Sequence, residues 1–446
     1  ANKGAGDEVF AGTVNRENAL EVRVTVLSAD NTLNRVIQMV AEAQAQQSPT
    51  QQMTQRFTRY FVPAVLVLVG LVVVVPPLLG WMTLAGSFYR GMLLLVAASP
   101  CALAIGTPAA VLTAIAQAAR NGVMIKGGVH LENLGALKVM AFDKTGTLTE
   151  GQFKVTDIVP LNGTAEADLL RLAAGVERQS AHPLAEAIVK AAVERALGSL
   201  PEVGGLENIE GRGVRCVVDG RPVMIGSLKL FDEVDSDVRE IVERLEGQGR
   251  TTMVVWQDGR FLGILALADT ARAGVGEVLQ RLMAAGVERL VMLTGDNEAA
   301  ANEVGREVGI TDVRAGLLPE EKLAAIREIQ GQYGPVAMTG DGVNDAPALA
   351  TATVGIAMGG AGTAVALETA DVALMADDLG QLPFAVGLSH ASRAVIKQNV
   401  AIALGVIGLL ILTSVTGVVE LSGAVVLHEW STILVVLNAL RLLRYK

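Results

Sequence analysis

Four long apolar segments, placed as two pairs on either side of a polar stretch, constrain this chain more than any other feature of its sequence. A helix of about 20 apolar residues crosses the ~30 Å hydrocarbon core of a bilayer, because each residue adds about 1.5 Å. The four segments are long enough to do so, and they cover Phe57–Gly80, Met92–Ala119, Val400–Val419 and Leu421–Leu443. Pro100 and Pro108 are expected to break the second segment. The sequence therefore predicts two transmembrane hairpins, at 56–119 and 393–446.

Basic residues predict on which side of the membrane the rest of the chain lies. They gather outside the two hairpins, at Arg56, Arg59, Arg120, Lys126, Arg393, Lys397, Arg441, Arg444 and Lys446. The short hairpin loops contain at most one basic residue, Arg90. Lys and Arg are enriched on the cytoplasmic side of membrane proteins. We therefore expect both termini and the stretch from about 120 to 395 to be cytoplasmic.

Charge and cysteine usage exclude two classes of protein. The formal net charge is −10, whereas a nucleic-acid partner would need a basic face. The two cysteines, Cys101 and Cys216, lie far apart and indicate no disulfide framework. Cys216 falls in an apolar, strand-like run and is expected to be a small core residue.

The stretch between the hairpins alternates strand-like and helical patterns, which predicts an α/β fold. Short buried strands, each followed by a glycine-containing turn, are expected at Val139–Phe142, Leu290–Leu293, Val336–Met338 and Val354–Met358. Such a series is typical of a parallel sheet whose chemistry lies at the carboxyl ends of its strands. Residues 156–262 interrupt it with two helices and then strand-rich sequence, at Glu166–Arg178, Pro183–Ala196, Gly213–Ile225 and Met253–Leu265. We interpret them as a domain inserted into an α/β domain built from 120–155 and 263–392.

Asp143 lies in the most informative string of the chain, AFDKTGTLTEG at residues 141–151. An apolar strand delivers this carboxylate to a tight polar turn that includes Lys144 and Thr145. A carboxylate is a poor nucleophile in water, but beside a divalent cation it can attack a γ-phosphorus in line. Backbone N–H groups and hydroxyls of the turn can hold the phosphoryl oxygens. The DKTGTLT string resembles the phosphorylation signature of P-type ATPases.

Three further motifs follow in the order that this family requires. TGDN at 294–297 offers Thr294, Gly295 and Asp296 to the phosphate, and Lys322 in LLPEEK is a candidate charge clamp on the phosphoryl group. The string TGDGVNDAPAL covers residues 339–349. The resemblance implies a haloacid dehalogenase-like phosphorylation domain that uses ATP and Mg²⁺. It also implies the Mg²⁺ ligands Asp143, Thr145 and Asp341, supported by Asn344 and Asp345.

The inserted domain carries the string ERQSAHPLAEA and, further on, GRGV at 211–214. Glu177 and His182 resemble the nucleotide-contacting pair of the heavy-metal branch of this family. Gly211 and Gly213 match the glycine pair of that branch, where close approach of the backbone to the nucleotide needs the absence of a side chain. The resemblance therefore implies an α+β nucleotide-binding domain at 156–262. Ser227 stands where many members have Asn, and it is left out of the predicted site.

The second apolar segment contains Ser99-Pro100-Cys101. A proline disrupts the preceding turn and frees carbonyl groups, which is tolerated at membrane depth only where they line a cavity. Cys101 offers a soft ligand and Ser99 an oxygen. His428 and Glu429 near the start of the fourth segment are costly at membrane depth and are functional by default, unless both lie at the outer interface. Thr432 could add an oxygen.

The string HEWSTILVVLNALRLL resembles the last-span motif of the heavy-metal subgroup that has Ser-Pro-Cys in its membrane domain. Members of that subgroup are associated with cobalt, and some with zinc or iron. The resemblance implies export of a divalent ion, Co²⁺ first and Zn²⁺ next, held by Cys101, His428 and Glu429. Trp430 departs from the motif, which usually has Gly, and its bulk is expected to affect the cavity. The resemblance also implies the plasma (inner) membrane of a prokaryote.

Residues 1–55 are expected to form part of an actuator domain and a linker helix, with β-rich sequence at 1–27 and a polar helix at Leu33–Gln47. The Thr-Gly-Glu loop of that domain does not occur in the sequence, and GDEVFAGTVN resembles the sequence just after it. The chain is therefore expected to lack amino-terminal spans and this loop. Two other functions stay open: a membrane-anchored phosphatase or phosphotransferase without transport, and a catalytically incompetent fragment of a pump.

Overall fold

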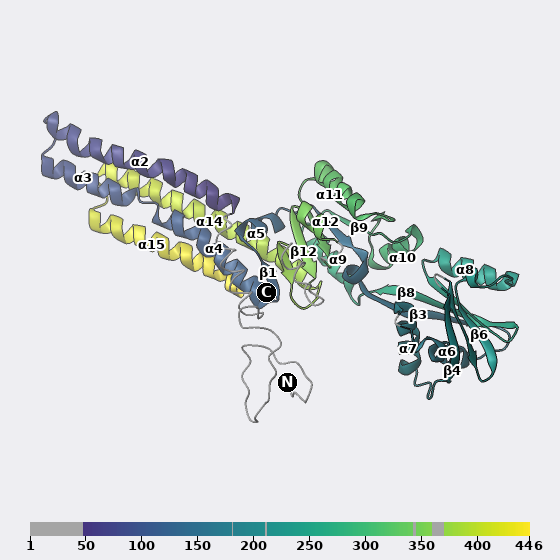
Figure 1. Ribbon diagram of the computed structural model, residues 1–446. Helices are drawn as coiled ribbons and strands as arrows, with labels where there is room; N and C mark the ends of the chain where they lie inside the picture. Colours follow the sequence, from purple (N-terminus) through teal and green to yellow (C-terminus); the bar gives the residue numbers. More distant parts are fainter. Residues whose placement is uncertain (1–47, 181, 210–211, 342–344, 359–369) are drawn as a thin grey trace, which may run out of the picture. The chain divides into compact units, whose positions relative to one another are not determined.

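The computed structural model describes residues 48–180, 182–209, 212–341, 345–358 and 370–446 (Figure 1). They divide into two compact units, one formed by the ends of the chain up to Leu137 and from Ala370, and the other by Lys138–Thr369. The predicted strands at 1–27 and helix at Leu33–Gln47 lie outside the described residues. Most of the expected partial actuator domain, 1–55, lies outside them too.

The first unit contains four helical segments that are long and apolar enough to cross a membrane, at Pro49–Leu78, Leu84–Arg120, Gln381–Ser414 and Leu421–Arg444. Helices α2 (Pro49–Leu78), α14 (Gln381–Thr416) and α15 (Leu421–Leu440) run beside the second segment (Figure 1). The prediction of four apolar spans is confirmed.

The second apolar segment is two helices, α3 (Leu84–Ala97) and α4 (Cys101–Arg120), separated at Ala98–Pro100. The predicted break at Pro100 is confirmed, and α4 begins directly at Cys101. The predicted break at Pro108 is wrong, because α4 continues through it. A proline inside a helix removes one backbone hydrogen bond and clashes with the carbonyl group of the preceding turn. Packing of the residues next to Pro108 opposes this cost. Thr107 and Ala110, on either side of Pro108, are both buried.

The first unit also contains helix α5 (Gly128–Leu134) and an antiparallel pair of short strands, β1 (Val123–Ile125) and β13 (Val372–Leu374). Glu132 of α5 accepts a hydrogen bond from the Thr50 hydroxyl at 2.9 Å, at the start of α2. Ser48 caps that helix and forms a capping box with Gln51. The amino end of α2 is therefore fixed to α5.

The second unit contains five parallel strands in the order β12-β11-β2-β9-β10. Their bounds are Val354–Met358, Val336–Gly340, Val139–Asp143, Arg289–Leu293 and Asp312–Arg314. The four predicted strands are confirmed, and β10 was not predicted. Helices α9 (Val275–Ala284), α10 (Glu298–Val308), α11 (Pro319–Tyr333) and α12 (Ala346–Thr351) follow strands of this unit. Burial is complete along β2, β11 and β12, which explains the apolar runs Val139–Phe142, Val336–Met338 and Val354–Met358 in them.

A second sheet of this unit has six antiparallel strands in the order β3-β8-β7-β6-β5-β4. Their bounds are Thr149–Pro160, Arg260–Ala271, Thr251–Gln257, Arg221–Gly226, Gly213–Val218 and Val203–Ile209. Helices α6 (Glu166–Glu177) and α7 (Pro183–Glu194) contribute to the hydrophobic core on one face. Helix α8 (Ser236–Gly247) packs on alternate residues of β7 and β8. The sheet extends beyond the predicted inserted domain, 156–262, at both ends, and the domain boundaries stay predictions.

Candidate functional site

The carboxyl ends of three neighbouring parallel strands bring the predicted phosphate residues together. Asp143 is the last residue of β2 and pairs with Leu293, so Thr294 follows at the same edge of the sheet. On the other side of β2, Phe142 pairs with Thr339 of β11, and Asp341 follows two residues later. Three strings separated by up to 200 residues of sequence therefore meet at one edge, as the parallel-sheet prediction required.

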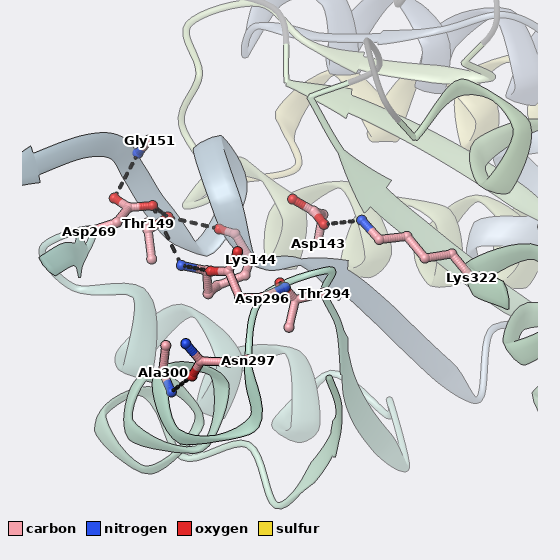
Figure 2. Close-up of polar contacts among 10 residues, drawn as sticks. All are labelled: Asp143, Lys144, Thr149, Gly151, Asp269, Thr294, Asp296, Asn297, Ala300 and Lys322. Carbon is pink, nitrogen blue, oxygen red and sulfur yellow. Dashed lines mark hydrogen bonds and ion pairs between the residues drawn. The ribbon is translucent and has the colours of Figure 1, made fainter. Parts of the chain in front are cut away.

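Lys322 bridges two buried carboxylates at the centre of this edge. Its Nζ lies 2.5 Å from Asp143 Oδ1 (Figure 2) and 2.8 Å from Asp345 Oδ1. The exposed fractions of the three side chains are 10%, 8% and 1%. Helix α11 carries Lys322 in its first turn, after a proline at the first helical position that favours helix initiation there. The predicted clamp therefore contacts Asp143 directly.

Burial, together with nearby carboxylates, raises the affinity of Asp143 for protons. Burial and repulsion from Asp345 raise the pKa of Asp143 to about 7, against the opposing attraction of Lys322. Burial likewise raises the pKa of Asp345, again opposed by Lys322. Burial alone lowers the pKa of Lys322, but attraction to the two carboxylates outweighs it, and the net shift is upward. The three carboxylates of this edge, Asp143, Asp341 and Asp345, therefore carry more negative charge when ionised than Lys322 compensates.

The loop after Asp143 turns sharply at Gly146, where φ is 72°. A Cβ at this glycine would lie 3.7 Å from Asp341 Cβ, so the loop passes close to the end of β11. Thr147 in the loop and Thr339 in β11 are fully buried, and neither hydroxyl has a hydrogen-bond partner among the described residues. Thr145 is exposed. The site thus holds buried hydroxyl groups with unused hydrogen-bonding capacity.

Lys144 and Asp296, both predicted site residues, form an ion pair with each other (Figure 2). Lys144 Nζ also lies 3.8 Å from Asp269 Oδ2. Asp296 donates its backbone N–H to the Thr294 hydroxyl at 3.1 Å, and Thr294 is buried while Gly295 is exposed. These contacts join the loop after β2 to the loop after β9.

The predicted nucleotide residues lie on the six-stranded sheet and its helices. Glu177 ends α6 and is buried, and burial raises its pKa to about 7. Burial, together with repulsion from the nearby Glu177, raises the pKa of the Cys216 thiol in β5 to about 11. His182 is exposed, and its Nδ1 accepts the Leu184 N–H at 3.2 Å as the cap of α7. The prediction that Cys216 is a core residue is confirmed.

The pairing of β5 with β6 requires a glycine at position 213, and this requirement was not evident from the sequence. A Cβ there would lie 2.2 Å from the Ile225 carbonyl oxygen, and its φ is 145°. The residue before it, Arg212, accepts the Ser227 N–H through its carbonyl at 2.9 Å. Gly211 lies outside the described residues, as does Asn344 in the phosphate site.

The predicted cargo residues lie on α4, on α15 and, for Ser99, in the break before α4. Ser99 Oγ lies 3.0 Å from Cys101 Sγ, and Cys101 is exposed. His428 is buried, and its Nε2 has no hydrogen-bond partner in the part of the chain that the structure describes. Glu429 is exposed, and Thr432 donates to the His428 carbonyl at 3.4 Å.

No group of three or more His, Cys, Asp or Glu side chains in the described ranges is arranged to hold a metal ion. The structure therefore does not assemble the predicted cargo ligands into one site. It also separates His428 from Glu429, because successive residues of a helix point about 100° apart. Trp430 is 57% exposed, whereas His428 is buried.

Comparison with known proteins connects these features. A family model for haloacid dehalogenase-like hydrolases matches residues 137–353. A probable cadmium-transporting ATPase of Alkalihalophilus pseudofirmus is 45% identical over 100% of this chain, which spans 62% of that relative. The zinc-transporting ATPase of Bacillus subtilis is 42% identical over 99% of this chain and 69% of its own length. The chain belongs to the heavy-metal-transporting P-type ATPases.

A solved structure agrees with this membership. A zinc-transporting PIB-type ATPase in the E2·Pi state superposes with a TM-score of 0.82 at 42% identity, over 94% of this chain and 68% of that one. The predicted fold, a membrane helix bundle with a haloacid dehalogenase-like domain and an inserted domain, is confirmed at the level of the family. The chain spans about three fifths of the length of several curated relatives (62%), so activity and cargo of the whole protein are taken up below as proposals.

Two ATPase residues that sequence reasoning missed are Asp269 and Arg272, at the end of β8. Asp269 accepts the Thr149 hydroxyl at 2.5 Å and the Gly151 N–H at 3.0 Å (Figure 2). Arg272 donates to the Gly146 carbonyl at 2.7 Å and to the Thr149 carbonyl at 3.0 Å. Both therefore hold the loop that follows Asp143. An acid and a base three residues apart, directly after the long apolar strand of ILALADTAR, are the sequence signal that marks them.

The edge of the parallel sheet that carries Asp143 and Asp341 fits Mg²⁺. This ion prefers oxygen ligands and is usually held by one or two carboxylates together with substrate phosphates. Asp143 and Asp341 supply two, close enough for Asp341 to contribute to the raised pKa of Asp143. A dication would offset the excess negative charge that burial otherwise makes unfavourable.

Proposed function

We propose that this chain is the catalytic and cargo-binding part of a pump that exports a divalent transition-metal ion through an aspartyl-phosphate on Asp143. One observation carries the proposal. A buried carboxylate bonded to Lys322 lies at a sheet edge with buried hydroxyls that have no hydrogen-bond partner among the described residues, in a chain whose four apolar segments include a Ser-Pro-Cys break. A phosphatase without transport accounts for the first of these features and leaves the membrane helices without a role.

In the proposed reaction an Asp143 carboxylate oxygen attacks the γ-phosphorus of ATP, the bond to the β-phosphate oxygen breaks, and ADP leaves. The new acyl-phosphate bond is later broken by water, which releases inorganic phosphate and restores the carboxylate. Mg²⁺, when bound at Asp143 and Asp341, supplies positive charge for the transferring phosphoryl group. Because only the ionised carboxylate is a nucleophile, Lys322 assists by opposing the protonation of Asp143.

Other residues of the chain orient the reactants. The Thr294 and Thr147 side chains at the edge are suited to bind phosphoryl oxygens. Lys144, held by Asp269 and Asp296, fixes the loop in which it lies. We propose that Glu177, His182 and the Gly211–Gly213 turn position the nucleotide, with Glu177 in its protonated form able to donate a hydrogen bond below about pH 7.

For the cargo we propose Zn²⁺ or Cd²⁺ ahead of Co²⁺. The relatives named above are zinc- and cadmium-transporting ATPases, and one from Escherichia coli, 41% identical, is a zinc/cadmium/lead-transporting P-type ATPase. Cobalt was the first expectation from the Ser-Pro-Cys motif. Cys101 and His428 are the proposed principal ligands, because a thiolate and an imidazole suit borderline divalent ions better than Cu(I). Ser99, Thr432 and Glu429 are proposed as secondary ligands.

The test is phosphoenzyme formation from labelled ATP and Mg²⁺ in the full-length protein, with Zn²⁺, Cd²⁺, Co²⁺ or Cu⁺ added separately. We expect acid-stable label that depends on Zn²⁺ or Cd²⁺ and vanishes in Asp143→Asn. Cys101→Ala and His428→Ala should weaken metal dependence, whereas Cys216→Ala in the inserted domain controls for loss of any thiol. Label that forms without an added metal would favour the phosphotransferase, and a response to Cu⁺ alone would refute the divalent cargo.

A further inference from the structure

Three of the membrane helices converge on Gly106 of α4 with no room for a side chain. A Cβ at this position would lie 2.5 Å from Val435 Cγ1 of α15 and 3.3 Å from Asn399 Cβ of α14. Val435 and Asn399 are themselves fully buried, with exposed fractions of 0% and 1%. Small residues let membrane helices approach closely, and here the approach involves three helices at one point.

A chain of side-chain amides passes through the same point. Asn399 donates its Nδ2 to the Gly106 carbonyl at 3.2 Å, and its Oδ1 accepts Asn438 Nδ2 at 2.9 Å. Asn438 also donates to Gln398 Oε1 at 3.1 Å, and its own Oδ1 accepts Arg441 Nη1 at 2.8 Å. The chain therefore links α15 to α14 and α14 to the backbone of α4.

A buried amide between apolar helices is costly unless it is bonded, and an apolar side chain of similar size would pack there without that cost. Asn399 is therefore not explained by packing alone. Its bonds are specific to one arrangement, because the Gly106 carbonyl and the Asn438 amide must both be within reach.

The convergence point lies close to the proposed cargo ligands along both helices that carry them. Gly106 is in the second turn of α4, which begins at Cys101. Val435 shares the buried face of α15 with His428, and residues seven apart in a helix lie on one side of it. Ala102 and Leu103, directly after Cys101, pack in one hydrophobic cluster with Val435 and Ala403 of α14.

We propose that Asn399 is a positioning residue for metal binding: by tying α14 to the Gly106 carbonyl and to Asn438, it fixes the distance between Cys101 and His428. This rests on the proposed function, because those two residues are the proposed cargo ligands. Asn399 itself does not touch the metal. Its loss should lower affinity for the metal and leave the phosphorylation chemistry intact.

The first test is Asn399→Leu in the full-length protein, with Zn²⁺ and Cd²⁺ as probes. We expect the metal concentration for half-maximal phosphorylation from ATP to rise at least about tenfold, the usual effect of removing a residue that orients a metal ligand. Maximal phosphorylation and metal-independent phosphorylation from inorganic phosphate should stay unchanged. Asn121→Ala is the matched control, since the Asn121 amide bonds to Gln117 within α4 alone. An unchanged metal requirement, or equal loss of phosphorylation from inorganic phosphate, would overturn the proposal.

A second test does not depend on removing a buried amide. Gly106→Ala should raise the metal requirement because its methyl group would meet Val435, and adding Val435→Ala should restore most of the loss. Val435→Ala alone serves as the reference. If the double variant keeps the raised metal requirement, the close approach of the helices at Gly106 does not determine the geometry of the metal site.

A readout without activity separates this proposal from the proposed function. In metal-free protein the reaction rate of Cys101 with a maleimide should change severalfold in Asn399→Leu and stay constant in Asn121→Ala. If the wild type shows no metal response but this change is observed, Asn399 still fixes the surroundings of Cys101, and the role of both residues in metal binding falls. If the wild type responds to metal and neither labelling nor metal requirement changes, the positioning role falls.

Discussion

Lys322 holds two carboxylates that would otherwise repel each other in a buried site. Removing one partner of a buried ion pair leaves an uncompensated charge, which usually costs more than the pair contributed. Lys322 thus links the proposed phosphorylation of Asp143 to stability, because the ammonium group that bonds Asp143 also makes the burial of this carboxylate tolerable.

Lys322→Met should therefore destabilise the second unit by about 3 kcal/mol or more, measured as a lower thermal unfolding temperature. Adding Asp345→Asn should recover part of the loss. The control is Lys138→Met, which breaks a pair with Glu288 whose side chains are 52% and 62% exposed. Exposed pairs contribute about 0–1 kcal/mol. Equal effects of the two lysine variants would contradict the account of Lys322.

Glu177 makes stability depend on pH. Its pKa is raised from 4.5 to about 7 in the folded chain, so between these values the folded state binds more protons than the unfolded state. Its contribution to stability is complete below pH 4.5 and is lost as pH rises through 7. The loss amounts to roughly 3 kcal/mol, at 1.36 kcal/mol for each pKa unit.

Glu177→Gln removes this titration. We expect the unfolding temperature of the variant to match that of the wild type near pH 4 and to exceed it at pH 8. Glu166→Gln, at the exposed amino end of the same helix, should change neither value. A Glu177→Gln variant with the same pH profile as the wild type would show that this carboxyl group is not held in its protonated form.

At the scale of elements, the six-stranded sheet depends on a close approach between β5 and β6. Gly213 pairs with Gly226, and each would place a Cβ within 3 Å of the backbone of the other strand. Such contacts involve backbone atoms that cannot rotate away, unlike the end of a side chain. Gly213, the second glycine of the GRGV string, is therefore needed for strand pairing, in addition to its proposed role at the nucleotide.

Gly213→Ala should lower the unfolding temperature even without ATP, with a loss of about 1–3 kcal/mol from the strained backbone. Gly204→Ala in the neighbouring strand β4 is the control, because its Cβ would be 3.9 Å from the Val217 carbonyl oxygen, an ordinary contact. ATP binding should be compared in both variants. A Gly213→Ala protein that unfolds normally but loses ATP would restrict the role of this glycine to the nucleotide.

At the scale of the whole molecule, the distribution of Lys and Arg predicts that both hairpin loops face outward and that the insert is cytoplasmic. This can be measured by placing single cysteines in a background with Cys101→Ala and Cys216→Ala. Trp81 and Val418 are 73% and 75% exposed in the two hairpin loops, and Glu233 is exposed before α8.

We expect a membrane-impermeant maleimide to label Trp81→Cys and Val418→Cys in intact cells, and Glu233→Cys only after permeabilisation. Glu233→Cys also controls for reagent access, because the maleimide must label this cysteine once the membrane is permeabilised. Labelling of Glu233→Cys in intact cells would reverse the predicted orientation.

The sequence by itself determined the elements and the chemistry that follow from local patterns. Apolar length identified the four spans, and Pro100 marked the break before Cys101, because a missing N–H acts on its own helix. The apolar runs before Asp143, Thr294 and Asp341 identified the strands that carry the phosphate site. Pro108 was misjudged, since the packing that keeps α4 helical there comes from other parts of the fold.

The tertiary structure alone decided which side chains share a contact. Lys322 bonding Asp143 and Asp345 together, Asp269 and Arg272 holding the phosphorylation loop, and Asn399 reaching the Gly106 carbonyl each join residues far apart in sequence. It also decided that His428 is buried and Glu429 exposed, although they are neighbours in the chain. Sequence patterns report the periodicity of single elements, whereas these pairings depend on how the elements pack against one another.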